Sequence, residues 1–459
     1  MTIADVISRL TDVLGADRIL LDEPRRRLYE CDGLMQYRAI PAAVVFPLTT
    51  ADVQAIVSIC AETNTPYVAR GSGTGLSGGA LPIAEGVLIV LSKMRRILDI
   101  DVPNQRVTIE PGVVNSEISR AVAAHGLYYA PDPSSQTVCT IGGNVAENSG
   151  GAHCLKYGFT TNHVVAITVV TPDANVVHLG STASVDAPGY DLLGAFVGSE
   201  GTLGIVTSVW LRFVPAPELA LPVVAAFPDV GSGCRAAQAC LACGIVPSAL
   251  EYLEGSAVAL VRDAFPGVFP DHAGFLLIAE ADGDVDEARR GLEALCDVLA
   301  DGAVAQWTPA SRKEREALWR WRDGVGIAAD GFLGGKVSED IAVPIDRLAE
   351  AIEQTQAIAA RHGLAGCSWG HAGDGNLHST FMFRASDPAA ARAAQSAADE
   401  LFATAIALGG TISGEHGVGT VKAGQLQHQW PAAGVRLHGE IKRIFDPKRL
   451  LNPGKKVGA

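Results

Sequence analysis

The hydrophobic pattern near the start of the chain predicts two helices and two short strands. The segment MTIADVISRLTDVLG carries apolar residues at helical spacing, which is typical of an amphipathic helix and not of a secretory signal peptide. Apolar residues recur at the same spacing over Val53–Cys60, and Thr49 with Asp52 predicts a capping box just before them. Apolar runs that end at Phe46 and at Ala69 predict strands on either side of this second helix.

The second of these strands leads into RGSGTGLSGGALP, a glycine-rich stretch that begins at Arg70. Its segment Gly73–Gly78 matches the G-x-G-x-x-G pattern of dinucleotide-binding folds, and an acid follows about 20 residues later, at Asp99 or Asp101. That motif requires a helix directly after the glycines. Pro82 interrupts any such helix, and GVLIVLS then predicts another strand. We therefore expect a backbone cradle for phosphate and not a Rossmann site.

Strand patterns continue to about Pro217. They lie in RVTIEPGV, VVAITVVTPDANVVHL and GIVTSVWLRFVP, and the second of these predicts a hairpin around Pro172 and Asp173. This part of the chain therefore predicts a mixed, strand-rich domain.

The next region has a different rhythm. The segments ALPVVAAFPD, IVPSALEYL, GFLLIAEADG and AVAQWTP predict strands, which alternate with helices near 231–243, 254–264 and 284–300. Two further long helices are predicted near 345–362 and 387–408. This β-α-β order is typical of a ferredoxin-like sheet with helices on one face.

Composition and charge narrow the class of protein. A chain of 459 residues is too long for a single core, and no apolar stretch approaches the ~18 residues of a membrane span. The formal net charge of −14 argues against nucleic acid as a partner, because a phosphate backbone needs a basic face. Nine cysteines without a framework spacing predict a reduced, cytoplasmic protein. The C-x-x-C at Cys240 and Cys243 has no second pair to complete a zinc site, so we interpret these as buried helix cysteines.

Two more glycine clusters stand in the first region, at Pro131–Gly158 and Gly198–Thr207. The first of them mixes glycines with short hydroxyl and amide side chains. Glycines allow close approach of a ligand to the backbone, and the polar side chains can hydrogen-bond it. One cluster alone would favour a set of tight turns, but three in one region favour a large, extended, anionic ligand.

Histidines and acids gather in two later segments. GHAGDGNLHSTF places His371 and His378 seven residues apart around a Gly-Asp-Gly turn, and TISGEHGVGTVK supplies Glu415 and His416. Two imidazoles and a carboxylate are a plausible ligand set for zinc or another divalent metal; the alternative is hydrogen-bonded structural histidines. His416 is a candidate general base. Arg322 is a candidate partner for a substrate carboxylate, the alternative being a solvated helix charge.

Together these motifs resemble the FAD-linked 2-hydroxy-acid dehydrogenases of the vanillyl-alcohol-oxidase flavoprotein superfamily. The resemblance rests on RGSGTGLSGG, PDPSSQTVCTIGGNVAENSGG, GSEGTLGIVT, GHAGDGNLH, SGEHGVG and FDPKRLLNPGK, which follow one another in the family's order from about Pro41 to Lys456. The family includes the flavin subunit of bacterial glycolate oxidase, D-lactate dehydrogenase and D-2-hydroxyglutarate dehydrogenase, so the substrate stays open among these.

The resemblance implies an α+β fold in which an inserted ferredoxin-like cap divides an FAD-binding domain into two parts. It places an N-terminal helical segment at 1–38, the FAD-binding domain at 39–217, the cap at 218–415 and the returning C-terminal segment at 416–459.

The resemblance also implies which residues hold FAD. In covalent members of the superfamily a histidine follows R-G-x-G in the first loop; Thr74 stands there in this chain, which implies non-covalent FAD. The Ile205–Val206 backbone is expected near the adenine, and Asn452 is expected to close over the flavin. The full set implied is Arg70, Gly71, Ser72, Gly73, Thr74, Gly75, Gly78, Gly79, Pro133, Ser134, Thr137, Gly142, Gly143, Asn144, Asn148, Gly150, Gly201, Gly204, Ile205, Val206 and Asn452.

By the same resemblance, His371, His378 and Glu415 match metal ligands, His416 the catalytic base and Arg322 the arginine that binds the substrate carboxylate. The implied reaction is oxidation of a 2-hydroxy acid to the 2-oxo acid by hydride transfer to flavin N5. A quinone, a cytochrome or an electron-transfer flavoprotein then takes the electrons. The alternatives left open are an FAD-binding subunit of a larger complex with little activity alone, a homodimer, and peripheral association with a membrane.

Overall fold

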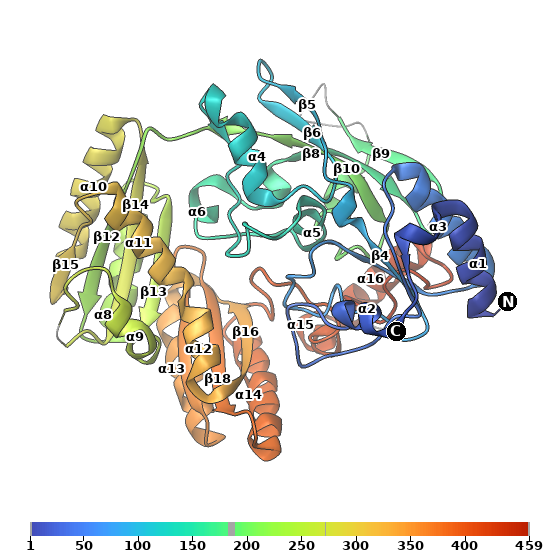
Figure 1. Ribbon diagram of the computed structural model, residues 1–459. Helices are drawn as coiled ribbons and strands as arrows, with labels where there is room; N and C mark the ends of the chain where they lie inside the picture. The colour runs from blue at the N-terminus through green and yellow to red at the C-terminus, as the bar shows by residue number, and fades with distance from the viewer. Residues whose placement is uncertain (1, 182–188, 271, 458–459) are drawn as a thin grey trace. The chain divides into compact units, whose positions relative to one another are not determined.

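The computed structural model describes residues 2–181, 189–270 and 272–457 (Figure 1). The chain forms two compact units: the first comprises residues 1–151, 158–216 and 415–459, and the second comprises residues 152–157 and 217–414. The sequence places the domain boundaries after residues 217 and 415, one residue later than the boundaries of these units. It does not anticipate the assignment of residues 152–157 to the second unit.

The first unit contains three sheets. A four-stranded sheet has the order β1-β2-β4-β3, with β1 antiparallel to β2 and the other pairs parallel. A five-stranded antiparallel sheet has the order β5-β6-β10-β8-β9, and β7 pairs with β11. The strands are β1 (Ile19–Leu20), β2 (Ala43–Val45), β3 (Tyr67–Arg70), β4 (Val87–Val90), β5 (Ile97–Asp101), β6 (Arg106–Ile109), β7 (Leu127–Tyr128), β8 (Val164–Val170), β9 (Val176–Gly180), β10 (Ile205–Arg212) and β11 (Val214–Pro215).

Short helices accompany these sheets. They are α1 (Ile3–Leu14), α2 (Glu23–Arg26), α3 (Thr50–Thr63), α4 (Asn115–Val122), α5 (Ile141–Glu147), α7 (Leu192–Phe196), α15 (Leu426–Gln429) and α16 (Ala432–Phe445). The expected capping box is confirmed: the Thr49 hydroxyl accepts the Asp52 amide at 3.1 Å, and the Asp52 carboxylate accepts the Thr49 amide at 3.2 Å. One apolar core joins α1 and α3 to the four-stranded sheet, and another lies on the five-stranded sheet.

No helix follows β3, as the sequence predicts; within the described chain the glycine-rich loop leads directly to β4, which is parallel to β3. The hairpin expected around Pro172 and Asp173 is also present as β8 and β9. By contrast, α5 was not expected, because it lies inside a glycine-rich segment of low helix propensity.

The second unit is built on one antiparallel sheet of order β15-β12-β14-β13-β17-β18-β16. Its strands are β12 (Leu219–Phe227), β13 (Ala249–Glu254), β14 (Phe275–Gly283), β15 (Ala305–Trp307), β16 (Gly334–Ala342), β17 (Ala365–His371) and β18 (Asn376–Arg384). Its helices are α6 (Cys154–Tyr157), α8 (Val230–Ala242), α9 (Gly255–Val261), α10 (Val285–Leu299), α11 (Arg312–Asp323), α12 (Val325–Leu333), α13 (Leu348–Arg361) and α14 (Pro388–Ala407).

The predicted α+β class is confirmed, but helices cover both faces of this sheet and not one. Phe275 of β14 packs against Gly233 of α8, whereas its neighbour Leu276 joins a core with Val258 of α9 and Trp321 of α11. Successive strand residues point to opposite faces, so the two helix sets lie on opposite sides. The sheet is also larger than expected. Strands β16 and β17 contain glycines and polar residues, and β18 begins with polar residues, so none of the three has an obvious strand pattern.

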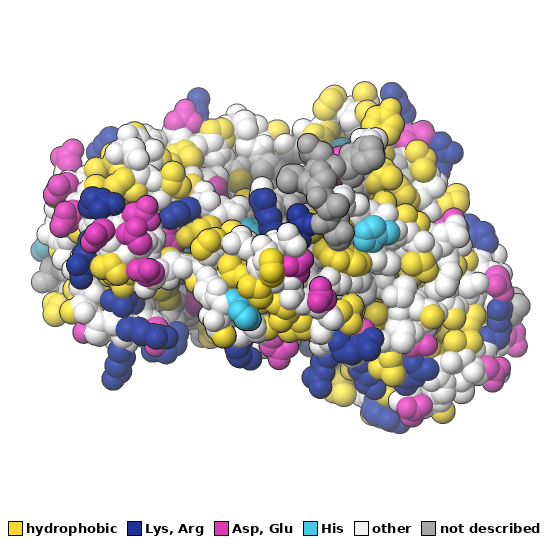
Figure 2. All heavy atoms as spheres, turned by 90° about the horizontal axis from the view of Figure 1, so that it is seen from above, with side chains coloured by type: hydrophobic (Ala, Val, Ile, Leu, Met, Phe, Trp, Pro, Cys, Tyr) yellow, Lys and Arg dark blue, Asp and Glu magenta, His cyan; other side chains and the backbone are white. Residues whose placement is uncertain are grey.

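Within the described residues, no helix is long and apolar enough to cross a membrane. Figure 2 shows acidic and basic side chains mixed over the visible face, with hydrophobic ones between them. The net charge of −14 is therefore not gathered into a single acidic surface on that face.

Candidate functional site

A large cleft in the first unit lies against the glycine-rich loop after β3. It has a volume of about 1320 Å³, part of which is open to solvent. Most of its lining comes from four parts of the chain: β3 with its loop, the segment around α5, the segment from Phe196 to Val206, and the C-terminal segment that carries His416 and Asn452. Leu91 and Pro111 complete the lining. Its wall combines glycines, short polar residues and apolar residues such as Leu91 and Phe196, a mixture that suits a dinucleotide with a flat aromatic ring system.

The cofactor residues expected from the sequence line this cleft, except for Gly78, Thr137 and Asn148. Gly78 lies beside the Thr420 side chain instead. The Asn148 side-chain oxygen accepts the Thr161 amide at 2.8 Å, and Thr137 is exposed elsewhere on the same segment.

The chemistry of the cleft wall fits FAD. A Cβ added at Gly71 would lie 2.1 Å from Thr140 Oγ1, so the absence of a side chain at Gly71 is what allows this close packing. Thr140 Oγ1 and Glu147 Oε2 both line the cleft and are buried without a hydrogen-bond partner among the described residues. Buried polar atoms of this kind are normally satisfied, so a polar ligand in the cleft would supply their missing partners.

Glu147 is a cleft residue that the sequence did not single out. Burial, and then the negative charge of Glu200, raise the pKa of Glu147 well above its ordinary value. Glu147 therefore favours its protonated form more than an exposed glutamate does, whereas Glu200 accepts hydrogen bonds from the amides of Val418 at 2.9 Å and Gly419 at 2.6 Å. We expected only glycines, hydroxyls and amides around an anionic ligand, which is why these acids were missed.

His416 and Glu415 line the same cleft, half-buried, with His416 Nε2 at 3.7 Å from Glu415 Oε1. The backbone just after His416 is held by Glu200 through Val418 and Gly419. A loop that is free of regular structure thus has a fixed position in the first unit, and it presents an imidazole to the ligand space.

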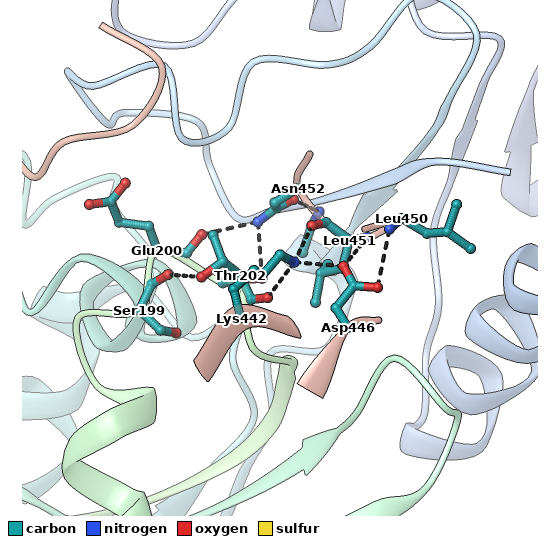
Figure 3. A network of polar contacts seen from close by, with 10 residues as sticks. Ser199, Glu200, Thr202, Lys442, Asp446, Leu450, Leu451 and Asn452 are labelled. Carbon is teal, nitrogen blue, oxygen red and sulfur yellow. Dashed lines mark hydrogen bonds and ion pairs between the residues drawn. The ribbon is translucent and has the colours of Figure 1, made fainter. Parts of the chain in front are cut away.

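The C-terminal segment completes the cleft through a buried polar network (Figure 3). The Asn452 amide donates to the carbonyls of Glu200 and Gly201, each at 3.0 Å, and its oxygen accepts the Ala69 amide at 3.2 Å. In Figure 3 the Lys442 ammonium reaches Asp446 and two backbone carbonyls. The Asn452 side chain thus links the end of β3 to the backbone of residues 200–201 through three hydrogen bonds.

In the second unit, the two predicted histidines come together on a hairpin. His371 ends β17 and lies opposite Asn376, while His378 of β18 lies opposite Trp369. Their ring centroids are 5.4 Å apart and the ring planes are nearly perpendicular, at 83°. The turn at Gly373–Gly375 reverses the chain as expected. Both histidines are strand residues, since β17 ends at His371 and β18 contains His378.

A buried carboxylate that the sequence did not reveal joins two candidate residues. Glu251 of β13 accepts a hydrogen bond from His371 Nδ1 at 2.5 Å and forms an ion pair with Arg322 of α11. Burial raises the pKa of Glu251, but Arg322 and His371 outweigh it, so the net pKa lies below the ordinary value. Arg322 is buried, so its interpretation as a solvated helix charge is wrong. Glu251 escaped notice because ALEYLE reads as an ordinary strand.

The donor set in the second unit fits a divalent metal in part. Two imidazoles on one hairpin are suitable nitrogen ligands for zinc, and a carboxylate on His371 Nδ1 leaves the Nε2 lone pair as the ligating one. Glu415 belongs to the first unit and directly follows Gly414, the last residue of the second.

Residues 152–157 are held in the second unit by ionic contacts to β14. His153 Nε2 lies 3.0 Å from Glu280, whose carboxylate also accepts Trp319 Nε1 at 3.0 Å. Lys156 and the Tyr157 hydroxyl both bind Asp282. The sequence does not reveal these contacts, because His153 and Lys156 are each more than a hundred residues away from their partners on β14.

Comparison with known proteins places the chain in a family. Residues 41–180 match the family described as "FAD binding domain", and residues 216–456 match "FAD linked oxidases, C-terminal domain". The chain is 39% identical to glycolate oxidase subunit GlcD of Escherichia coli (strain K12), over 94% of this chain and 86% of the relative. It is 34% identical to D-lactate dehydrogenase of Anaerostipes hadrus, over 96% and 95%.

Solved structures agree on the fold. A 4-ethylphenol oxidase from Gulosibacter chungangensis is similar with a TM-score of 0.81 and 21% identity, covering 99% of this chain and 97% of that one. A p-cresol methylhydroxylase is similar with a TM-score of 0.82 and 18% identity, covering 99% and 96%. Given the two family matches and the extent of the identity, the chain belongs to the FAD-linked oxidases.

Proposed function

We propose that this protein is an FAD-dependent oxidoreductase that converts a small 2-hydroxy acid, such as glycolate or D-lactate, into the 2-oxo acid and passes the electrons to an acceptor other than NAD. The observation that carries the proposal is that His416 lines the same cleft as the glycine-rich segments of the first unit. A base at the wall of a flavin cleft is what oxidation of an alcohol requires. Relatives named glycolate oxidase subunit and D-lactate dehydrogenase support the substrate class.

In this proposal the chain's own residues bind the acid and move its proton. Arg322 pairs with the substrate carboxylate through its planar fork. The His416 imidazole takes the hydroxyl proton and holds it until product leaves. Bound FAD supplies the acceptor for the hydride that leaves C2. Thr74 in the first loop offers no imidazole for a covalent link to the flavin.

We further propose that His371, His378 and Glu415 hold a divalent metal, with zinc as the first choice. A bound divalent ion supplies a Lewis acid that polarises the substrate hydroxyl. Support comes from the hairpin that brings the two imidazoles together and from the carboxylate on His371 Nδ1. For the electron acceptor we propose a quinone, a cytochrome or an electron-transfer flavoprotein.

The test is an anaerobic flavin-bleaching screen with glycolate, D-lactate, D-2-hydroxyglutarate, and longer or aromatic 2-hydroxy acids. Wild-type protein should bind FAD, and one small acid should bleach its absorption. His416→Ala should keep FAD but be reduced about 10²–10⁴-fold more slowly, the usual loss for a general base. His125→Ala, at an exposed histidine of the first unit, is the matched control and should behave as wild type. A purified protein without flavin, or one that no acid bleaches, would sink the proposal.

A second candidate is an FAD-binding subunit with little activity alone, because the glycolate oxidase relatives are named as subunits. The same screen separates the two candidates. Full bleaching by the isolated chain favours an enzyme complete in its reductive half-reaction. Retention of FAD with no bleaching by any acid favours the subunit.

A further inference from the structure

Glu251 occupies a central place in the second unit. It lies on β13 between β14 and β17, and its backbone stands directly opposite His371 in the sheet. Its side chain is fully buried, with 0% exposed. A carboxylate in such a position is costly unless partners compensate its charge.

Two partners do so, and they come from different elements. His371, at the end of β17, contributes Nδ1 at 2.5 Å, and Arg322, on α11, contributes Nη2 to the other carboxylate oxygen. Arg322 and His371 lie 71 and 120 residues after Glu251 in the sequence, so only the folded second unit brings them together.

The contact with Glu251 fixes the state of His371. A carboxylate at Nδ1 requires that this nitrogen carry a proton, which leaves the lone pair of a neutral ring on Nε2. The ring orientation is fixed at the same time, with His378 at 5.4 Å between centroids.

The contact also fixes Arg322. A guanidinium held at Nη2 by a buried carboxylate has a defined plane, and its fork recognises a second carboxylate only in that plane. Stability alone gives little reason for this arrangement, because apolar residues of similar volume often replace buried ion pairs without loss of stability.

We propose that Glu251 is a positioning residue that orients His371 for metal binding and Arg322 for binding of the substrate carboxylate at the same time. The inference rests on the proposed roles of those two residues. It predicts that metal affinity and hydroxy-acid binding fall together when Glu251 is changed, although Glu251 touches neither ligand.

Glu254 offers a matched control. It lies on the same strand and is also buried, but its carboxylate accepts the backbone amides of Ser256 at 3.0 Å, Ala257 at 3.1 Å and Ser368 at 3.1 Å, and the side-chain amide of Gln356 at 3.1 Å. Removing its charge therefore perturbs β13 and the neighbouring β17 without removing a contact of the His371 or Arg322 side chain.

The experiment compares full-length wild type, Glu251→Gln, Glu251→Asp, Glu254→Gln and His371→Ala, all with FAD bound. Zn²⁺ affinity is measured by competition with a coloured chelator, and the affinity for oxalate, an unreactive dicarboxylate, is measured from the shift of the flavin spectrum. Thermal unfolding and steady-state kinetics with the best acid of the bleaching screen complete the set.

Glu251→Gln should weaken Zn²⁺ binding about 10–100-fold, as loss of a carboxylate behind a metal-bound histidine does elsewhere. It should also weaken oxalate binding and raise KM more than it lowers kcat. Glu251→Asp should bind Zn²⁺ and oxalate more tightly than Glu251→Gln does. Glu254→Gln should keep the wild-type affinity for both, even if its melting temperature is lower.

The inference is overturned if Glu251→Gln binds Zn²⁺ and oxalate as wild type does, since Glu251 would then be a structural ion-pair residue only. If the wild-type flavin is bleached but the protein binds no Zn²⁺, the proposed role of Glu251 in metal binding is overturned, while the proposed oxidation of a hydroxy acid is unaffected. A wild type that binds Zn²⁺ but is bleached by no acid contradicts the proposed function, and the Zn²⁺ series still decides the role of Glu251.

Discussion

At the scale of single residues, Gly375 decides whether the two hairpin histidines can meet. It has a φ of +74°, and a Cβ there would lie 2.0 Å from the Val343 carbonyl oxygen, a backbone atom that cannot rotate away. Any side chain therefore meets both backbone strain and a clash. The spacing of His371 and His378 depends on this one glycine.

We predict that Gly375→Ala destabilises the protein by at least ~1–2 kcal/mol, the cost of a left-handed conformation for alanine. It should also weaken Zn²⁺ binding, because the turn shifts between the histidines. Gly331→Ala is the control: it lies in α12 with open space around it, so alanine should be neutral or up to ~1 kcal/mol stabilising. Thermal unfolding and chelator competition measure both, and a Gly375→Ala protein with wild-type values would contradict the argument.

Lys455 is the residue whose protonation should affect stability most visibly. Burial lowers its pKa to about 7, against the opposing charges of Asp32, Glu147 and Glu200. Its amine donates to the carbonyls of Gly79 at 2.8 Å and Leu81 at 2.6 Å. The folded chain thus gives up a proton that the unfolded chain keeps up to its ordinary pKa of 10.5.

Between about pH 7 and 10.5 the unfolded state binds the extra proton, so the contribution of Lys455 to stability rises with pH across that window. We predict that the melting temperature of flavin-free wild type, relative to Lys455→Met, increases from pH 7 to pH 9. Lys448→Met, at an exposed lysine of the same segment, should show no such trend. If the difference in melting temperature between wild type and Lys455→Met stays constant or falls as the pH rises, the assignment of a lowered pKa to Lys455 is contradicted.

At the scale of elements, α16 attaches the C-terminal segment to the first unit through one buried cation. Lys442 donates to Asp446 at 2.6 Å and to the carbonyls of Thr202 and Leu451, each at 2.8 Å. On the same helix, Arg443 forms an exposed ion pair with Glu440. The helix therefore carries a buried and an exposed ion pair one residue apart.

We expect Lys442→Met to lower the stability of the first unit by about 3–5 kcal/mol, because it leaves Asp446 buried without its cation. FAD should be lost at a lower temperature, since Asn452 depends on the same network. Arg443→Ala should change stability by no more than about 0.5 kcal/mol, as for other exposed pairs. Thermal unfolding followed by flavin fluorescence measures both; equal losses for the two variants would refute the assignment.

Local signals in the sequence predicted the elements of the first unit well. The capping box at Thr49 and Asp52, the strand before Arg70 and the interruption at Pro82 each act over a few residues, so they can be read without the fold. The candidate site was accessible for the same reason, since most residues that line the cleft stand in glycine-rich motifs.

The features that escaped prediction depend on distant partners. Helix α5 forms where glycines disfavour it, because Ile141 and Val145 are buried in the core of the five-stranded sheet. Strands β17 and β18 are half polar, and their sheet neighbours decide their conformation. The role of Glu251 depends on its contacts with Arg322 and His371, and no local sequence pattern connects these residues to it.

At the scale of the whole molecule, the expectation of a reduced protein is testable. All nine cysteines lie in the described chain and are free, and only Cys31, Cys243 and Cys296 are partly accessible. Burial raises the pKa of Cys60, Cys234, Cys240 and Cys367 to about 12.

We predict that a thiol reagent reacts rapidly with at most three cysteines of the native protein and with all nine after denaturation without reductant. Thiolates are the reactive form, so burial protects the rest. Fewer than nine reactive thiols in the denatured protein would show that a disulfide exists.

The division of the chain between the two units has a consequence for its synthesis. The first unit needs residues 415–459, yet the ribosome completes the entire second unit before it makes them. Domains generally fold as they emerge, so the second unit can be finished while the first still lacks Lys442, Asn452 and Lys455. The flavin cleft is therefore the last part of this protein to be completed, and a chain that stops early would have a folded second unit and an incomplete cleft.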